Sequence, residues 1–281
     1  TVSNPGVGIL NWSLDLSSKP DWLTIAPTSG TLGHNESEPV TVSVDITGLS
    51  AGQYSYVFDV IDLASQNSPQ TVTVNLEIAG LLAHWPMDGD AADSTGNGHD
   101  GMVIGAPVWA TEGKIDGAVL LDPNDGTLDY IEAPFVVNPA AGPFSVFAWV
   151  KGGADTVGII SQVDDATGTG RYWLGTNCGV LWSSLRIPGE WGLYDDAAWD
   201  TTSWHHVGVV WNEQRLRLYI DGAEAAVGDL WNQPLEACTG PLYIGTNKVA
   251  DPLYSWPGLI DDLRIYNYPL SESEIAALAG L

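Results

Sequence analysis

Aromatic and charged side chains alternate in one stretch of this chain, residues 171–200. An aromatic face can stack on the apolar side of a sugar ring, while arginine and aspartate hydrogen-bond to hydroxyls or carboxylates. The mixture is therefore typical of a carbohydrate-binding surface. The candidate ligand-binding residues are Arg171, Trp173, Trp182, Arg186, Trp191, Tyr194 and Trp199.

These aromatic residues have an alternative role, which is to pack the core or cover a sheet edge. Trp173 and Trp182 lie on predicted strands, where either role is open. Trp191, Tyr194 and Trp199 lie in PGEWGLYDDAAW, a predicted loop, and binding residues gather on loops that a rigid scaffold positions. We therefore expect these three side chains to be exposed.

A second polar stretch, DGDAADSTGNGHDG at residues 88–101, concentrates oxygen-bearing side chains among glycines. Calcium takes about 6 to 8 oxygen ligands from carboxylates, amides and backbone carbonyls. The same residue types also form ordinary surface turns, because Asp, Asn, Ser and Gly favour turn conformations. The residues alone leave both interpretations open.

The acidic residues do not form a glycosidase pattern. Such enzymes use two carboxylates about 5 to 9.5 Å apart across the scissile bond. The close acidic pairs here are adjacent in sequence, so a strand would point their members to opposite faces. The G-x-S-x-G and H-E-x-x-H motifs are absent, and we expect no enzyme activity. The adjacent pairs are Asp164 with Asp165, Asp195 with Asp196, and Asp261 with Asp262.

Short strands must position these residues. Alternation of apolar and polar residues is typical of a half-buried strand, and 32 Gly with 17 Pro fit many turns. The one predicted helix follows Ser271, because Ser271 and Glu274 form a capping box before IAAL. The fold class is therefore all-β with a short C-terminal helix. The predicted strands include residues 40–46, 71–78, 144–151, 205–211 and 215–221.

Three motifs mark the first part of the chain: DWLTIAPTSGTL at 21–32, GLSAGQYSY at 48–56 and SPQTVTVNLEI at 68–78. Together they resemble the BACON family of bacterial Ig-like β-sandwich domains. The resemblance implies such a sandwich over residues 1–80. The pattern starts afresh at residue 81 with LLAHWPMD, which places the domain boundary there.

Residues 81–281 carry an ordered set of motifs: HWPMDG, ADSTGNGHDG, GKIDGAVLLD, FSVFAWVK, SWHHVGVVW, LRLYIDG and GLIDDLRIYNYPLSESEIAAL. This succession resembles the laminin G-like, concanavalin A-like jelly-roll family in its bacterial form. The resemblance implies a two-sheet sandwich that is secreted or displayed on a cell surface. It also implies binding of polysaccharides or protein partners, although a fold does not identify the ligand.

The resemblance to this jelly-roll family implies a structural calcium ion between an early loop and the last strand. The last strand is GLIDDLRIY, in which Asp261 occupies the corresponding position and Asp262 points to the opposite face. We therefore expect calcium ligands from Asp93, Asn97, Asp261 and backbone carbonyls near His99.

Charge narrows the choice of partners. The chain has 9 Lys plus Arg against 35 Asp plus Glu, a formal net charge of −26. Nucleic acid and anionic membranes need a basic surface that nine cations do not supply. No apolar run reaches the ~18 residues of a membrane span. Neutral or weakly charged glycans are therefore the better candidates for the ligand.

The chain has two cysteines, Cys178 and Cys238. They could form one disulfide in an oxidising compartment, and the sequence does not decide whether they do.

These observations predict an extracellular, non-catalytic carbohydrate-binding module with a structural calcium ion. Its partner would be a polysaccharide or glycan, or a surface protein, and neither nucleic acid nor a membrane interior. Two alternatives stay open: a structural or adhesive surface module that binds protein or self-assembles, and a polysaccharide-degrading enzyme of the same fold. Released sugar ends would reveal the enzyme, and self-association would favour the adhesive module.

Overall fold

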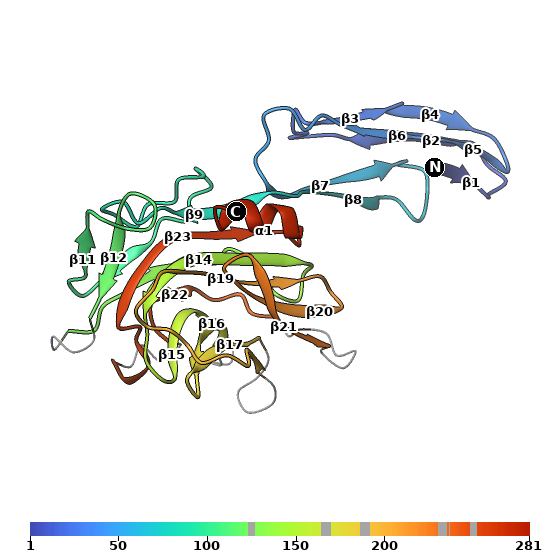
Figure 1. Cartoon of the computed structure of the whole chain (residues 1–281). Coiled ribbons are helices and arrows are strands. Elements are labelled where there is room, and N and C mark those ends of the chain that lie inside the picture. Colours follow the sequence, from blue (N-terminus) through green and yellow to red (C-terminus); the bar gives the residue numbers. More distant parts are fainter. Residues whose placement is uncertain (123–126, 164–169, 186–191, 230–234, 236, 248–251) are drawn as a thin grey trace. The chain divides into compact units, whose positions relative to one another are not determined.

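The chain forms two compact units, Thr1–Ile78 and Ala79–Leu281 (Figure 1). Antiparallel strands build both units, and the all-β class predicted from the sequence is confirmed. The computed structural model describes residues 1–281 except 123–126, 164–169, 186–191, 230–234, 236 and 248–251.

Short strands make up the first unit. They are β1 (Val2–Asn4), β2 (Leu10–Asp15), β3 (Leu23–Ala26), β4 (Ser29–Leu32), β5 (Glu36–Glu38), β6 (Thr41–Val44), β7 (Gly52–Ile61) and β8 (Gln70–Ile78). One sheet has the order β4-β2-β7-β8, and β1-β5 and β3-β6 form two-stranded sheets. Leu23, Ile25, Tyr56 and Phe58 form a buried cluster, because alternate residues of β3 and β7 face inward.

One strand of this unit is less buried than its alternation predicts. Residues 40–46 were expected to form a half-buried strand, yet β6 is exposed along its length, with Val42 and Val44 at 43% and 46% exposure. Its pairing partner β3 supplies the buried residues Leu23 and Ile25 instead.

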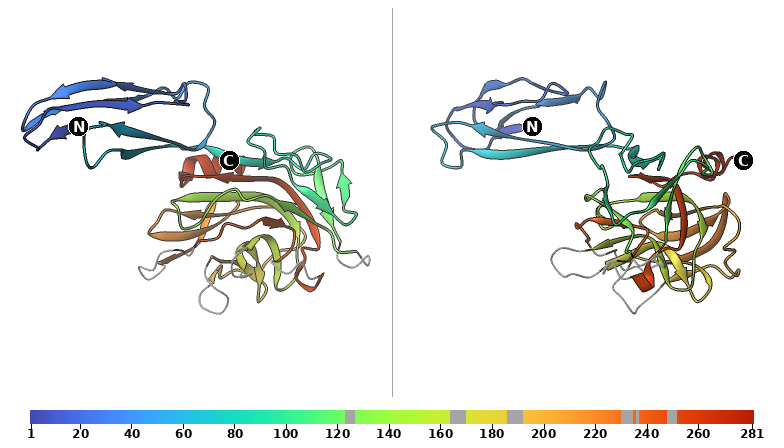
Figure 2. Two further views of the ribbon diagram at one scale, coloured as in Figure 1. Left: turned by 180° about the vertical axis from the view of Figure 1, so that it is seen from behind. Right: turned by 90° about the vertical axis from the view of Figure 1, so that its left-hand side faces the viewer.

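Two large sheets make up the second unit. Its elements are β9 (Leu81–Trp85), β10 (Met102–Ile104), β11 (Val108–Ala110), β12 (Ala118–Leu121), β13 (Tyr130–Ala133), β14 (Phe144–Gly152), β15 (Val157–Val163), β16 (Gly170–Asn177), β17 (Val180–Ser184), β18 (Leu193–Tyr194), β19 (His205–Trp211), β20 (Arg215–Ile220), β21 (Ala223–Asp229), β22 (Leu242–Ile244), the 3-10 helix η1 (Pro252–Tyr254), β23 (Gly258–Tyr266) and α1 (Glu272–Leu278). The sheet orders are β11-β12-β23-β14-β19-β20-β21, with β9 also paired to β23, and β10-β13-β22-β15-β16-β17-β18. Figures 1 and 2 show these sheets stacked as two layers, the jelly-roll sandwich expected from the sequence.

Apolar side chains from both sheets meet between the layers. Residues 144–150 of β14 are all buried: β14 lies between β23 and β19, the opposite sheet covers one of its faces, and Phe147 on the other face packs in a cluster with Ile275 of α1. Phe144 contacts Trp173 of β16 in the opposite sheet, with ring centroids 4.9 Å apart. The core of the second unit is therefore aromatic where the two sheets face each other.

The predicted C-terminal helix is α1. Ser271 is its N-cap and accepts a hydrogen bond from the Glu274 backbone N–H, while the Glu274 side chain accepts one from the Ser271 N–H. This reciprocal capping satisfies N–H groups that the first turn leaves unpaired. Ile275 is buried and joins a cluster with Phe147, Tyr219, Tyr266 and Leu270.

Two further sequence features have structural outcomes. Cys178 is exposed and Cys238 is buried, and the two form no disulfide. In the part of the chain that the structure describes, no helix has the length and hydropathy of a membrane span.

Candidate functional site

Three aromatic side chains form a continuous group on the outer face of the seven-stranded sheet. Tyr172 of β16 and Trp182 of β17 have ring centroids 4.7 Å apart, and Trp182 and Tyr194 of β18 have centroids 6.2 Å apart. Tyr194 is 42% exposed, whereas the other two are half-buried. We call Tyr172, Trp182 and Tyr194 the aromatic patch.

Strand register brings the aromatic patch together. Trp182 lies opposite Tyr194, and Tyr172 lies opposite Ser184. Directly opposed residues share a face, and so do residues two apart on one strand, such as Trp182 and Ser184. All three rings therefore project from the same side of the sheet, away from the inward-facing Trp173.

Amide groups orient the two tyrosine hydroxyls of the patch. Asn247 Nδ2 donates to the Tyr172 hydroxyl and Asn177 Nδ2 donates to the Tyr194 hydroxyl, each at 3.3 Å. Burial raises the pKa of Tyr172, so its phenol stays protonated at neutral pH. Each hydroxyl that accepts from an amide still has its own proton to donate. The patch thus combines apolar ring faces with polar groups that suit a sugar.

The structure places the predicted ligand-binding residues in different environments. Trp182 and Tyr194 belong to the aromatic patch, and Arg186 and Trp191 lie outside the described residues. Trp199 is half-buried, and its Nε1 donates to the Gly152 carbonyl at 2.8 Å. The Trp199 ring packs on His205 and Trp256, with centroids 5.1 and 6.1 Å away, so its contacts are those of a packing residue.

Two of the predicted ligand-binding residues are buried. Arg171 is 2% exposed, and Trp173 is fully buried against Phe144, the packing role that its strand position left open. The intervening Tyr172 is the residue of this strand that faces outward in the patch. Sequence analysis missed Tyr172 together with its amide partner Asn247. The alternation of side chains along the strand could have indicated Tyr172. If the other face of the strand is taken as the exposed one, the candidate residues shift by one position, from Arg171 and Trp173 to Tyr172.

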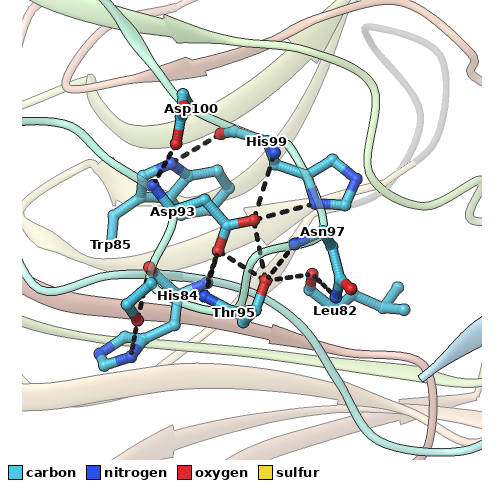
Figure 3. A network of polar contacts seen from close by, with 9 residues as sticks. Leu82, His84, Trp85, Asp93, Thr95, Asn97, His99 and Asp100 are labelled. Carbon is cyan, nitrogen blue, oxygen red and sulfur yellow. Dashed lines mark hydrogen bonds and ion pairs between the residues drawn. The ribbon is translucent and has the colours of Figure 1, made fainter. Parts of the chain in front are cut away.

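The acidic loop before β10 is organised around Asp93 (Figure 3). The Asp93 carboxylate accepts hydrogen bonds from the backbone N–H groups of His84, Thr95 and His99 and from the Thr95 hydroxyl. His99 Nδ1 lies 3.3 Å from its second oxygen. Burial alone would raise the pKa of Asp93, but these hydrogen bonds hold it below its usual value. The Asn97 side chain is likewise engaged, because its amide donates to the Leu82 carbonyl at 2.8 Å.

Asp261 belongs to a different group of contacts. Its Oδ2 accepts the backbone N–H groups of Lys114 and Ile115 at 2.7 and 2.8 Å. Its Oδ1 is buried with no hydrogen-bond partner among the described residues. Asp88 adds negative charge nearby, and its Oδ1 accepts the Gly117 N–H at 2.6 Å. Burial, with the charges of Asp262 and Asp88, raises the pKa of Asp261 to about 6.

The predicted calcium ligands therefore make separate sets of hydrogen bonds, Asp93 and Asn97 around their own loop and Asp261 with the N–H groups of Lys114 and Ile115. Within the described residues, no three His, Cys, Asp or Glu side chains are grouped to hold a metal ion. Asp93 and Asn97 already serve as hydrogen-bonding centres of their own loop. Asp261 Oδ1 has no hydrogen-bond partner among the described residues and lies on a side chain close to Asp88 and to the turn 113–117. This oxygen could therefore serve as a ligand to a cation that binds oxygen atoms.

Each of the two units matches a known protein family. Residues 125–276 match the family described as the concanavalin A-like lectin/glucanases superfamily, and the chain belongs to this superfamily. Residues 1–79 match the viral BACON domain, which confirms the BACON-like unit, although we expected its bacterial form. The superfamily description includes both lectins and glucanases. No curated protein matches the chain.

Solved structures resemble the second unit. One is domain 4 of AbnA, an extracellular arabinanase from Geobacillus stearothermophilus, in complex with arabinotriose: it is 25% identical with a TM-score of 0.56, and the match covers 72% of this chain and all of that one. Another is the binding domain of botulinum neurotoxin DC in complex with SialylT, at 14% identity and a TM-score of 0.53. That match covers 71% of this chain and 51% of the toxin domain, and it shows the fold alone.

Proposed function

We propose that this protein is an extracellular carbohydrate-binding module that holds a polysaccharide on the aromatic patch without cleaving it. The observation that carries the proposal is the outward-facing group of Tyr172, Trp182 and Tyr194, with hydroxyls held by amides. The similar arabinanase domain, solved with an oligosaccharide and described as part of an extracellular protein, supports both the ligand class and the location.

The net charge of −26 supports a neutral or weakly charged glycan as the ligand. Like charges repel, so a polyuronic or sulfated chain would approach an acidic surface at an electrostatic cost that low salt increases. Aromatic stacking and hydrogen bonding do not depend on ligand charge. Binding through the patch should therefore change little with salt concentration.

A panel of polysaccharides tests the proposal directly. Arabinan, xylan, mixed-linkage β-glucan and an acidic pectin are cast into native gels with the full chain, and the same mixtures are assayed for new reducing ends. We expect one of the neutral polymers to retard the protein with no product. Released sugar would identify an enzyme, and neither retardation nor product across the panel would favour a protein-binding surface module.

We also propose a structural calcium ion, held by the carboxylates of Asp261 and Asp88 and by backbone oxygens of the turn 113–117. The buried and unpartnered Oδ1 of Asp261 supports this position over Asp93. A bound cation would offset the repulsion between the two carboxylates and join this turn to β23. Its contribution would be to stability, since no contact links Asp261 to the aromatic patch among the described residues.

Calcium should raise the melting temperature of the second unit by about 5 to 10 °C at a concentration 100 times its Kd, because ligand binding stabilises the folded state. Differential scanning calorimetry with EDTA and then calcium measures the shift. Asp261→Asn should abolish the shift, while Asp90→Asn, an exposed acid of the neighbouring loop, is the matched control. An unchanged wild-type melting temperature would refute the calcium site, and equal loss in Asp93→Asn would restore the original ligand set.

A further inference from the structure

The first unit contains a cavity of about 250 Å³ beside the last strand of its four-stranded sheet. Its polar lining comes mainly from the loop between β7 and β8. Apolar cavities of ~150 Å³ bind benzene, so this one has room for a large apolar side chain. The apolar walls come from β1 and from three strands of the sheet: Val2, Leu10, Trp12, Val60, Ile61 and Val72.

The cavity is open at β8. Val72 of β8 lies directly opposite Phe58, which is 6% exposed, so both side chains point to the inner face of the sheet. Val72 is nonetheless 37% exposed, because β8 is the last strand of the sheet (Figure 1). A side chain from outside the unit can therefore enter the cavity past the edge of β8.

The outer edge of β8 is also free to pair with another strand. Within residues 1–78, which the structure describes throughout, no strand other than β7 pairs with β8. Proteins usually block such edges with lysine, proline or a β-bulge. Residues 70–78 contain no Lys, Arg or Pro, and β8 pairs with β7 over its whole length without a register shift. The edge thus offers a row of N–H and C=O groups to an incoming strand.

Charge and chemistry indicate what kind of strand would bind there. Residues 1–78 contain one Lys and no Arg against eight Asp and Glu, a formal net charge of −7. Opposite charges steer partners together, so a basic segment is favoured. The aliphatic walls of the cavity do not suit a sugar, because its hydroxyl groups would lose hydrogen bonds to water there.

We propose that β8 and the cavity beside it form a docking site for an extended, basic segment of a partner protein. The segment adds a strand to the free edge of β8, and one of its large apolar side chains enters the cavity. In strand addition of this kind, backbone hydrogen bonds provide affinity and a pocket beside the edge provides specificity. The site belongs to the first unit and goes beyond carbohydrate binding on the aromatic patch.

Synthetic peptides of nine residues, the length of β8, test the docking site by fluorescence anisotropy with the full chain. The peptides alternate valine with threonine and end in lysine, and phenylalanine replaces each valine in turn. We expect at least one phenylalanine position to bind, and replacing that phenylalanine by alanine should weaken binding about tenfold. Absence of binding across the set, or equal binding of the alanine peptide, would overturn the proposal.

Backbone methylation of the best peptide tests strand addition without changing the protein. Only every second N–H group of an added strand points to the edge that it joins. Methylating one alternate set of backbone nitrogens should therefore abolish binding, while methylating the other set should largely preserve it. Equal effects of the two sets would contradict pairing with β8.

A matched pair of variants tests the place of binding. Val72→Lys puts a charge at the opening of the cavity and should weaken binding about tenfold or more. Val57→Lys makes the same change at a valine that lies opposite Thr73 on the outer face of the sheet, and it should bind almost as well as the wild type. Equal loss in both would indicate charge attraction alone and overturn the site. Self-association of the wild type that Val72→Lys abolishes, measured by sedimentation velocity, would instead identify a second copy as the occupant.

Discussion

Replacing Trp182 by alanine should weaken polysaccharide binding by roughly 30-fold, because a central aromatic side chain at an interface contributes about 2 kcal/mol. Trp182 contacts both Tyr172 and Tyr194, so it occupies the middle of the aromatic patch. Its loss removes the largest ring and leaves its two neighbours separated. Isothermal titration calorimetry with the polymer identified in the panel measures the change.

The controls for Trp182→Ala separate binding from folding. Tyr194→Ala should weaken binding about tenfold and change the free energy of unfolding by less than about 1 kcal/mol, because Tyr194 is 42% exposed. Trp182→Phe keeps an aromatic face and should recover part of the affinity. If Trp182→Ala and Tyr194→Ala both bind as well as the wild type, the patch is not the binding site.

Trp173→Ala should instead lower the unfolding free energy of the second unit by about 3 to 5 kcal/mol, since removal of a large buried ring leaves a cavity. Trp173 is fully buried and packs on Phe144 across the two layers. Its Nε1 has no hydrogen-bond partner among the described residues, so Trp173→Phe should be milder, with no hydrogen bond lost. Urea unfolding followed by tryptophan fluorescence measures both variants.

The position of Trp173 distinguishes two interpretations of the stretch 171–200. If Trp173 is a core residue, replacing it must lower the free energy of unfolding, and any loss of binding should follow the fraction of unfolded protein. If Trp173 contacts the ligand, replacing it would weaken binding in a protein of normal stability. Normal stability with lost binding would therefore contradict the buried position and favour the sequence-based prediction.

Local sequence patterns determined the elements of this protein. The capping box at Ser271 and Glu274 predicted α1, and the strands predicted at 144–151, 205–211 and 215–221 correspond to β14, β19 and β20. Such patterns act between neighbours in the chain, through hydrogen bonds within one turn and through the alternation of a strand. The ordered motifs also indicated the laminin G-like fold. Trp182 and Tyr194 were selected as candidate ligand-binding residues because they are aromatic.

Only the tertiary structure decided which face of each strand is outside. Alternation defines two faces of a strand but not the one that meets the second sheet, so Arg171 and Trp173 were selected in place of Tyr172. The β-bulges between β15 and β16 weaken the pattern further, because each shifts the register by one residue.

Contacts between distant segments were equally out of reach of the sequence. Tyr130 and Tyr243 are neighbours because β13 pairs with β22, and the Asp261 carboxylate accepts N–H groups of Lys114 and Ile115. The acidic loop suggested Asp93 as a metal ligand by composition, yet folding surrounds that carboxylate with its own N–H donors. Residue types suggested the chemistry of this protein, and long-range strand pairing decided which side chains can perform it.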